Sequence, residues 1–142
     1  MLVETLIAGR GGLTAKEGRV RMSGAKPTGL RDVLLAFARV HILHHAAEER
    51  IFGAGMAAEL SRHGYRLSPG TLYPILHRLQ ADGLLSADAE VIDGKKRKYY
   101  RITAKGRACL KALLPKLEEL ADEVLPDGAR EHAKRKRHAV GR

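Results

Sequence analysis

Polar side chains lie along one side of a helix that the sequence predicts over residues 68–83. Ser68 can cap this helix, because a serine oxygen accepts a hydrogen bond from a free amide of the first turn. Pro69 follows at a position where its missing N–H costs nothing. The apolar residues recur at helical spacing and form one stripe: Leu72, Ile75, Leu76 and Leu79. The first turn and the other side carry groups suited to hydrogen bonding with base edges and phosphates: Ser68, Gly70, Thr71, Tyr73, His77 and Arg78.

Four consecutive cations follow this helix in a predicted β-hairpin. Residues 84–92 are apolar enough for a strand, Asp93-Gly94 is a strong two-residue turn signal, and residues 95–102 return as a second strand. The cations begin the returning strand: Lys95, Lys96, Arg97 and Lys98. A polar helix followed by a basic hairpin is the layout of a winged helix-turn-helix, whose helix enters the major groove of DNA while the wing contacts phosphates.

Some of these residues also have a structural interpretation. Arg78 stands four residues before Asp82 and can pair with it instead of contacting DNA. Tyr73 can pack against the protein instead of binding. The four cations alternate between the two sides of a strand, so about half of them are expected to reach phosphates. The same alternation predicts that one of Tyr99 and Tyr100 is buried while the other faces solvent or an interface.

Two helices are predicted to precede the polar helix. The first spans about residues 28–50 and has apolar residues along one side. Gly53 and Gly55 then interrupt the pattern, and a shorter second helix ends near His63, which a C-cap glycine follows. The predicted fold class is therefore mainly α with a small β-hairpin wing.

A final helix over residues 103–126 carries an apolar seam at steps of three and four. Thr103 can cap it, and the seam consists of Leu110, Leu113, Leu117, Leu120 and Val124. This spacing predicts a dimerisation helix, although such a seam can also pack on its own domain. Pro115 removes a helical hydrogen bond and clashes with the preceding turn, so a kink or a break is predicted near Leu114.

The distribution of charge separates these segments. The 142 residues carry a formal net charge of +10, which favours a polyanionic partner, and nucleic acid is the usual one. Residues 66–107 hold nine cations and four anions, whereas residues 108–127 hold two cations and five anions. DNA is therefore expected to meet the polar helix and the hairpin, and a protein partner suits the final helix better.

The chain resembles the PadR-type transcriptional regulators of bacteria over roughly residues 30–125. The resemblance is carried by residues 67–74 (Leu-Ser-Pro-Gly-Thr-Leu-Tyr-Pro), Leu76, Arg78-Leu79, Gly83-Leu84-Leu85, residues 97–103 (Arg-Lys-Tyr-Tyr-Arg-Ile-Thr) and Gly106. It implies a dimeric winged-helix repressor that binds its operator through helix 68–83 and wing 84–102. Two-fold symmetry then predicts an inverted-repeat operator. Some relatives answer to phenolic acids or drugs at the dimer interface, so the resemblance also implies that a small-molecule effector could bind there.

These inferences divide the chain into four parts. They are a disordered basic arm (residues 1–27), a winged-helix DNA-binding domain (28–102), a C-terminal dimerisation helix (103–126) and a basic disordered tail (127–142). Met22 could serve as an alternative translation start, so the sequence leaves open whether residues 1–21 belong to the natural protein.

Histidines on the first helix support a second, weaker hypothesis. His41 and His45 are four residues apart and could share a metal ion, which would make the chain a metal-responsive regulator. Packed or solvated histidines are more common on helices. The sequence therefore predicts neither a metal site nor a cofactor, and the metal-responsive regulator is kept as an alternative.

Other classes of function find little support in the sequence. It has no glycine-rich phosphate loop and no Gly-x-Ser-x-Gly motif, so an enzyme is not expected. A protein-interaction or adaptor module built on the winged fold stays open as an alternative. The single cysteine, Cys109, and the lack of a signal peptide or of an apolar stretch of about 18 residues predict a cytoplasmic protein without a membrane span.

Overall fold

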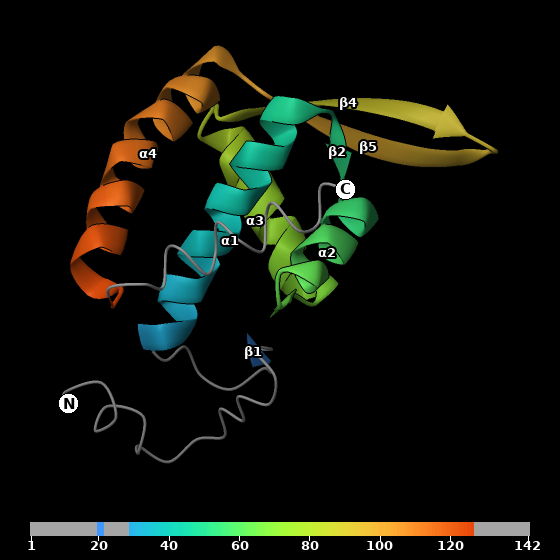
Figure 1. The fold of residues 1–142 in the computed structure, drawn as a ribbon. Coiled ribbons are helices and arrows are strands. Elements are labelled where there is room, and N and C mark those ends of the chain that lie inside the picture. Colours follow the sequence, from blue (N-terminus) through green and yellow to red (C-terminus); the bar gives the residue numbers. More distant parts are fainter. Residues whose placement is uncertain (1–19, 22–28, 127–142) are drawn as a thin grey trace, which may run out of the picture. The chain divides into compact units, whose positions relative to one another are not determined.

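A computed structural model describes residues 20–21 and 29–126 of the chain. Three helices, a β-hairpin and a fourth helix follow one another, with short strands between them (Figure 1). These elements belong to two compact units, residues 1–107 and residues 108–142. The predicted arm and tail lie outside the described residues, except for strand β1 (Val20–Arg21), which pairs in parallel with β3 (Tyr65–Arg66). No helix within residues 29–126 has the length and hydropathy that a membrane span requires.

The first three helices supply most of the apolar core of the first unit. They are α1 (Gly29–Glu48), α2 (Gly53–Arg62) and α3 (Pro69–Ala81). The stripe predicted on α3 is confirmed, since each of its four residues is at most 5% exposed. The core also contains Ala38, Ile42, Leu43 and Ala46 of α1 and Met56 and Leu60 of α2. Burial of a leucine or isoleucine side chain contributes about 1.5–3 kcal/mol before the cost of ordering the chain, so this core fixes one face of α3 and leaves the other free.

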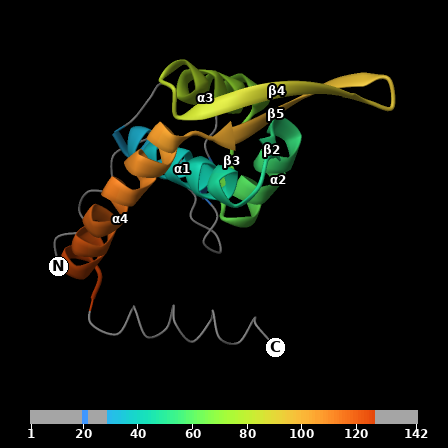
Figure 2. The same ribbon diagram turned by 90° about the horizontal axis from the view of Figure 1, so that it is seen from above.

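An antiparallel sheet of three strands packs beside these helices. It consists of β2 (Ile51–Phe52), β5 (Lys95–Ile102) and β4 (Leu85–Ile92), in that order. Strand β2 was not predicted, and it explains why α1 ends at Glu48 instead of near residue 50. The hairpin β4–β5 projects beyond helices α1–α3 (Figures 1 and 2).

The turn of the hairpin has the predicted conformation. Asp93 and Gly94 connect the strands with φ angles of 50° and 72°. Two successive left-handed residues are what a type I′ turn needs, because its twist matches that of the strands. The fold class predicted from the sequence, mainly α with a small hairpin wing, is confirmed.

Both tyrosines of β5 are buried, so the prediction that only one of them is buried is wrong. Tyr100 is 1% exposed and Tyr99 is 8% exposed. On the face that was expected to be open, the ring of Phe52 lies edge-on to Tyr99 with centroids 5.7 Å apart, and the guanidinium of Arg50 lies 4.1 Å from the Tyr99 centroid. The segment that contains β2 therefore covers Tyr99, which the alternation of side chains along β5 would leave exposed.

Helix α2 begins earlier than predicted. Gly53 and Gly55 do not interrupt it but lie in its first turn. A Cβ atom at Gly53 would be 2.5 Å from the hydroxyl oxygen of Tyr73. The glycine therefore reflects close packing with α3 and not the end of a helical segment.

The final helix, α4 (Ala104–Val124), starts as predicted but is not interrupted. The Thr103 hydroxyl accepts a hydrogen bond from the Gly106 amide at 3.0 Å and donates one to the Gly83 carbonyl at 2.6 Å. This confirms the predicted cap. Pro115 lies inside the helix, so of the predicted kink or break the break is wrong: a proline removes one amide donor, and the flanking turns continue on both sides.

Candidate nucleic-acid interface

The first turn of α3 presents two hydroxyl groups. The Ser68 carbonyl accepts hydrogen bonds from the amides of Thr71 and Leu72, both at 2.9 Å. The Ser68 side chain makes no capping bond, and its Oγ lies 3.2 Å from Oγ1 of Thr71. The predicted side-chain cap is therefore wrong, because the two hydroxyls pair with each other. Ser68 and Gly70 are exposed and Thr71 is half-buried, at the helix end whose dipole favours anions.

Tyr73 packs against the protein and is also exposed. The end of its ring lies against the backbone of Gly53, yet 42% of the residue is exposed. His77 is exposed one turn later, and the centroids of the two rings are 6.4 Å apart. Packing on α2 thus fixes the direction of Tyr73 without removing its ring from the surface.

Arg78 is exposed and forms the pair that was considered as the alternative to DNA contact. Its Nε donates a hydrogen bond to Oδ2 of Asp82 at 3.0 Å. Exposed helical pairs of this kind contribute about 0.3–0.5 kcal/mol. Such a pair is weak enough for the guanidinium to exchange it for a phosphate.

The four cations of β5 lie on both sides of the strand, as alternation predicted. The Arg97 guanidinium lies 4.7 Å from the centroid of the Phe52 ring. The Lys98 ammonium lies on the other side, where it donates a hydrogen bond to Oε1 of Gln80 in α3 at 2.9 Å. Lys95 and Lys96 stand next to the turn and are exposed. The wing is thus joined to α3 near its middle and carries exposed charge toward its tip.

A pocket of about 360 Å³ brings α3 and the wing together. It is lined by Phe52, Gly53, Ala54, Tyr73, Lys95, Lys96, Arg97 and Lys98. Five of the residues predicted to bind DNA therefore surround one hollow. His77 and Arg78 do not line it and lie farther along α3.

An ion pair joins the residue before β2 to β4, the strand at the other edge of the sheet. The Arg50 guanidinium binds the Glu90 carboxylate, and this interaction raises the pKa of Arg50. Neither residue was predicted to matter, because the two are 40 positions apart and no local pattern connects them. Together with Gln80, they are the positioning residues of the wing that the sequence did not reveal.

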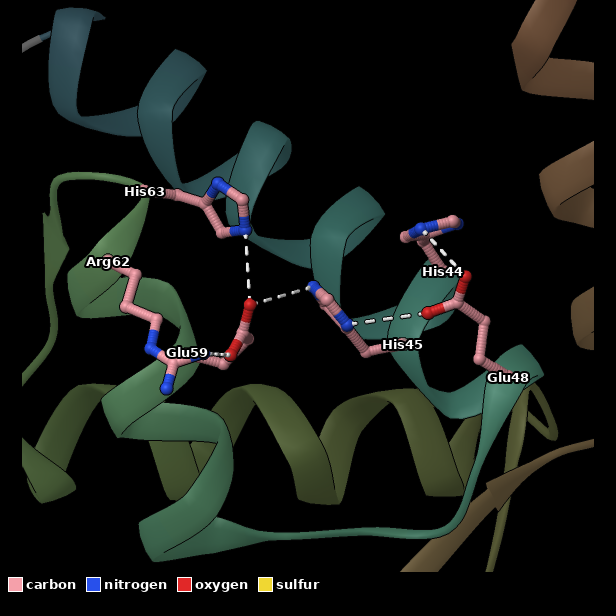
Figure 3. A network of polar contacts seen from close by, with 6 residues as sticks. All are labelled: His44, His45, Glu48, Glu59, Arg62 and His63. Carbon is pink, nitrogen blue, oxygen red and sulfur yellow. Dashed lines mark hydrogen bonds and ion pairs between the residues drawn. The ribbon is translucent and has the colours of Figure 1, made fainter. Parts of the chain in front are cut away.

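A cluster of histidines occupies a different part of the first unit. His41 and His45 of α1 meet His63, which caps the C-terminus of α2, and one ring nitrogen of each lies within 4.8 Å of the others. Figure 3 shows His45 and His63 on either side of the Glu59 carboxylate, whose Oε1 is 3.8 Å and 3.4 Å from their Nε2 atoms. Burial, followed by the nearby histidines, lowers the pKa of His41. The sequence suggested His41 and His45 but not His63, which comes from another helix.

The seam of α4 has exposed and partly exposed side chains. Leu120 is 46% exposed and Val124 is 63% exposed, while Leu110, Leu113 and Leu117 are partly exposed. Among the described residues of α4, Gly106 alone is buried. The helix therefore has an apolar face that its own residues do not bury.

Comparison with known proteins associates this architecture with one family. The model of the transcriptional regulator PadR-like family matches residues 42–112. The transcriptional regulator Rv3488 of Mycobacterium tuberculosis is 57% identical over 96 residues, which cover 68% of this chain and 90% of that protein.

Solved structures show a similar fold. A PadR family transcriptional regulator from Eggerthella lenta has a TM-score of 0.58 at 28% identity, covering 67% of this chain and 88% of its own. A PadR-like transcriptional regulator from Bacillus cereus has a TM-score of 0.60 at 29% identity, covering 66% of this chain and 92% of its own.

Proposed function

The chain belongs to the PadR-like family of transcriptional regulators, and we propose that it is a dimeric repressor that binds an operator through α3 and the β4–β5 wing. The family and these relatives are regulators of transcription and not enzymes, in agreement with the sequence prediction. Residues 28–102 would form the DNA-binding domain and residues 103–126 the dimerisation helix. A protein that binds DNA requires a cationic surface beside a helix that fits the major groove.

The pocket between Tyr73 and the wing is the observation that carries this proposal. Tyr73 and the residues Lys95, Lys96, Arg97 and Lys98 line a hollow of about 360 Å³ at the surface, while the Lys98 ammonium itself binds Gln80 on the other side of the strand. A phosphate group seated there would meet ammonium and guanidinium groups, which neutralise it, and a hydroxyl, which can donate a hydrogen bond. Phosphate contacts of this kind set the position of the protein on the duplex without selecting a base sequence.

The exposed side of α3 would supply the contacts that select the sequence. The proposed DNA-contacting residues of the helix are Ser68, Gly70, Thr71, Tyr73, His77 and Arg78, and those of the wing are Lys95, Lys96, Arg97 and Lys98. The Thr71 hydroxyl stands in the first turn, which points toward base edges when a recognition helix lies in the major groove. A hydroxyl can donate a hydrogen bond to a base edge or accept one from it.

Dimerisation through α4 would explain its uncovered apolar face. The proposed contact residues are Leu110, Leu113, Leu117, Leu120 and Val124. Two copies related by a two-fold axis would place their recognition helices about 34 Å apart on the duplex, so the operator would be an inverted repeat. A small-molecule effector at that interface stays a prediction of the family resemblance.

Removing the two cations nearest the turn tests the wing. We expect Lys95→Ala/Lys96→Ala to weaken binding to specific and nonspecific duplexes alike, because phosphate contacts are independent of sequence. If each lysine neutralises one phosphate, the slope of log affinity against log salt falls by about 1.8 per subunit and the affinity at 0.15 M salt falls by about 30-fold per subunit. Fluorescence anisotropy with a duplex selected by the parent chain from a random library measures both quantities.

A matched variant on α4 separates the effect of contacts made by the wing from the effect of a lower net charge on DNA affinity. Lys111→Ala/Lys116→Ala removes the same charge from exposed positions outside the proposed interface, and it should retain the parent's salt slope within about half a unit. Equal effects of the two double variants would contradict a role for the wing. Absence of any duplex preference in the parent at about 150 mM salt would favour the adaptor alternative.

Thr71→Ala should change base preference more than salt dependence. The substitution removes a hydroxyl from the helix but no charge, so the salt slope should stay that of the parent. Discrimination at one base pair of each half-site should fall by about 1–3 kcal/mol. Selection of binding sites from a random library by parent and variant compares the two preferences, and identical selected sites would show that Thr71 does not read bases.

A further inference from the structure

The histidine cluster between α1 and α2 has the composition and geometry of a metal site. His41 and His45 project from successive turns of α1, and His63 approaches from the end of α2. The rings of His41 and His63 are stacked with centroids 4.5 Å apart, and those of His45 and His63 are 6.0 Å apart. Because the three come from two helices, the tertiary fold itself brings the ligand atoms together.

One nitrogen of the cluster is buried without a hydrogen bond. Among the described residues, Nε2 of His45 has no hydrogen-bond partner although solvent does not reach it. The Glu59 carboxylate lies 3.8 Å from it, which is too long for a hydrogen bond. A buried polar atom left in this way destabilises the folded chain, and a cation bound between the rings would satisfy it.

We propose that His41, His45 and His63 bind a divalent metal ion of the zinc class, with the Glu59 carboxylate as the fourth ligand. The proposal is independent of DNA binding, since none of these residues belongs to α3 or to the wing. The sequence suggested His41 and His45 as ligands, and the structure adds His63 as a third candidate. Occupation would link α1 to the segment that leads into α3.

The donor set selects the class of metal. Imidazole nitrogen suits zinc, copper, nickel and iron, whereas calcium and magnesium require oxygen ligands. Three imidazoles and one carboxylate fit tetrahedral zinc. Zinc–nitrogen bonds of about 2.0–2.1 Å place the ligand atoms about 3.4 Å apart in a tetrahedron, so the rings need to move inward by about an ångström. His63 has the freedom for this, because it lies at a helix end and its side chain is 41% exposed.

The other histidine of this region supplies a matched control. His44 lies on the same helix, its side chain is 56% exposed, and it faces Glu48 at 3.5 Å (Figure 3). It does not belong to the group whose ligand atoms converge. His44→Asn and His63→Asn therefore make the same chemical change at two exposed positions, and only the second removes a proposed ligand.

Metal titration of the full chain tests the proposal. The chain is stripped with a chelator and titrated with Zn²⁺ by calorimetry, and with Co²⁺ by its visible absorption. We expect one ion per chain at this site, the intense absorption of tetrahedral cobalt, and a loss of affinity of about 100-fold or more in His63→Asn but not in His44→Asn. Glu59→Gln, which keeps the shape of the side chain, should weaken binding by about 10- to 100-fold.

Stability measurements keep the test independent of folding defects. Zn²⁺ should raise the melting temperature of the parent and of His44→Asn, because a ligand that binds only the folded state stabilises it. It should raise the melting temperature of His63→Asn far less, while the metal-free variants melt within a few degrees of the parent. Equal zinc affinity in His63→Asn and His44→Asn, octahedral cobalt absorption, or equally tight binding of Mg²⁺ would each overturn the proposal.

Discussion

Replacing Leu117 and Leu120 of α4 by aspartate should convert the proposed dimer into a monomer. Both residues belong to the seam, and Leu120 is 46% exposed in the single chain. Two carboxylates placed in an apolar interface between two copies would lose their hydration and repel their symmetry mates. Size-exclusion chromatography with light scattering should show a dimer for the parent and a monomer for the variant at the same concentration.

The same variant should lose most of its affinity for the operator. Two linked DNA-binding domains bind with an affinity about 10²- to 10⁴-fold higher than one domain, because the second half-site is bound intramolecularly. We therefore expect binding to an inverted repeat to fall by at least about 100-fold, while binding to a single half-site changes little. Anisotropy titrations with the two duplexes measure this difference.

Ala112→Asp is the matched control for the seam. Ala112 is exposed on α4 and stands two residues from Leu110, outside the pattern of the seam. The control adds an acidic side chain to the same helix and should remain dimeric. A dimeric Leu117→Asp/Leu120→Asp variant, or a monomeric parent that binds the full operator equally well, would contradict dimerisation through α4.

Gly106→Ala should be among the most destabilising single-atom additions in the chain. A Cβ atom at this position would be 2.2 Å from the Leu84 carbonyl oxygen and 2.7 Å from Cγ1 of Ile102. Alanine favours a helix over glycine by about 1 kcal/mol, but overlap with a backbone atom forces residue 106 away from Leu84. Since overpacking costs about 1–3 kcal/mol and sometimes more, we expect a net loss of about 2 kcal/mol in the free energy of unfolding.

Thermal and urea denaturation measure the effect of Gly106→Ala. A loss of about 2 kcal/mol corresponds to a melting temperature lower by about 10 °C in a domain of this size. Gly70→Ala serves as the comparison, because the nearest atom to its added Cβ, Oγ of Ser68, is 3.9 Å away. It should be neutral or slightly stabilising, and equal melting temperatures for the two variants would show that the contact with Leu84 is relaxed at little cost.

Local patterns in the sequence predicted the parts of the fold that depend on neighbouring residues. The stripe of α3, the Asp93-Gly94 turn and the Thr103 cap each involve residues a few positions apart, and the structure confirms all three. The dipeptide Asp-Gly needs only its own backbone preferences to form the turn. Helical spacing is likewise enough to place one face of α3 in the core.

Features that depend on distant residues were missed or misread. Strand β2 consists of two residues, too few to show alternation, and its pairing with β5 decided the burial of Tyr99. The Ser68 hydroxyl pairs with the Thr71 hydroxyl and makes no hydrogen bond to a backbone amide of the first turn. His63 joined His41 and His45 only because α2 folds back on α1. Such outcomes follow from tertiary packing, which competes with local preference and often prevails.

The same contrast holds for the candidate site. Residue types and order were enough to name the polar side of α3 and the cations of the wing as candidates. The sequence could not show that Tyr73 rests on Gly53 or that Lys98 binds Gln80. These contacts determine which of the candidate residues line the same pocket.

The anchoring of the hairpin has a consequence for the thermodynamics of association. Its middle is held by the Arg50–Glu90 ion pair, by Arg97 on the Phe52 ring and by the Lys98–Gln80 hydrogen bond. A hairpin restrained in this way has lost most of its conformational freedom before it binds a duplex. Binding therefore fixes few additional torsion angles of the hairpin. Removing these contacts should therefore shorten the lifetime of a complex chiefly through entropy, even when Lys95 and Lys96 at the tip are kept.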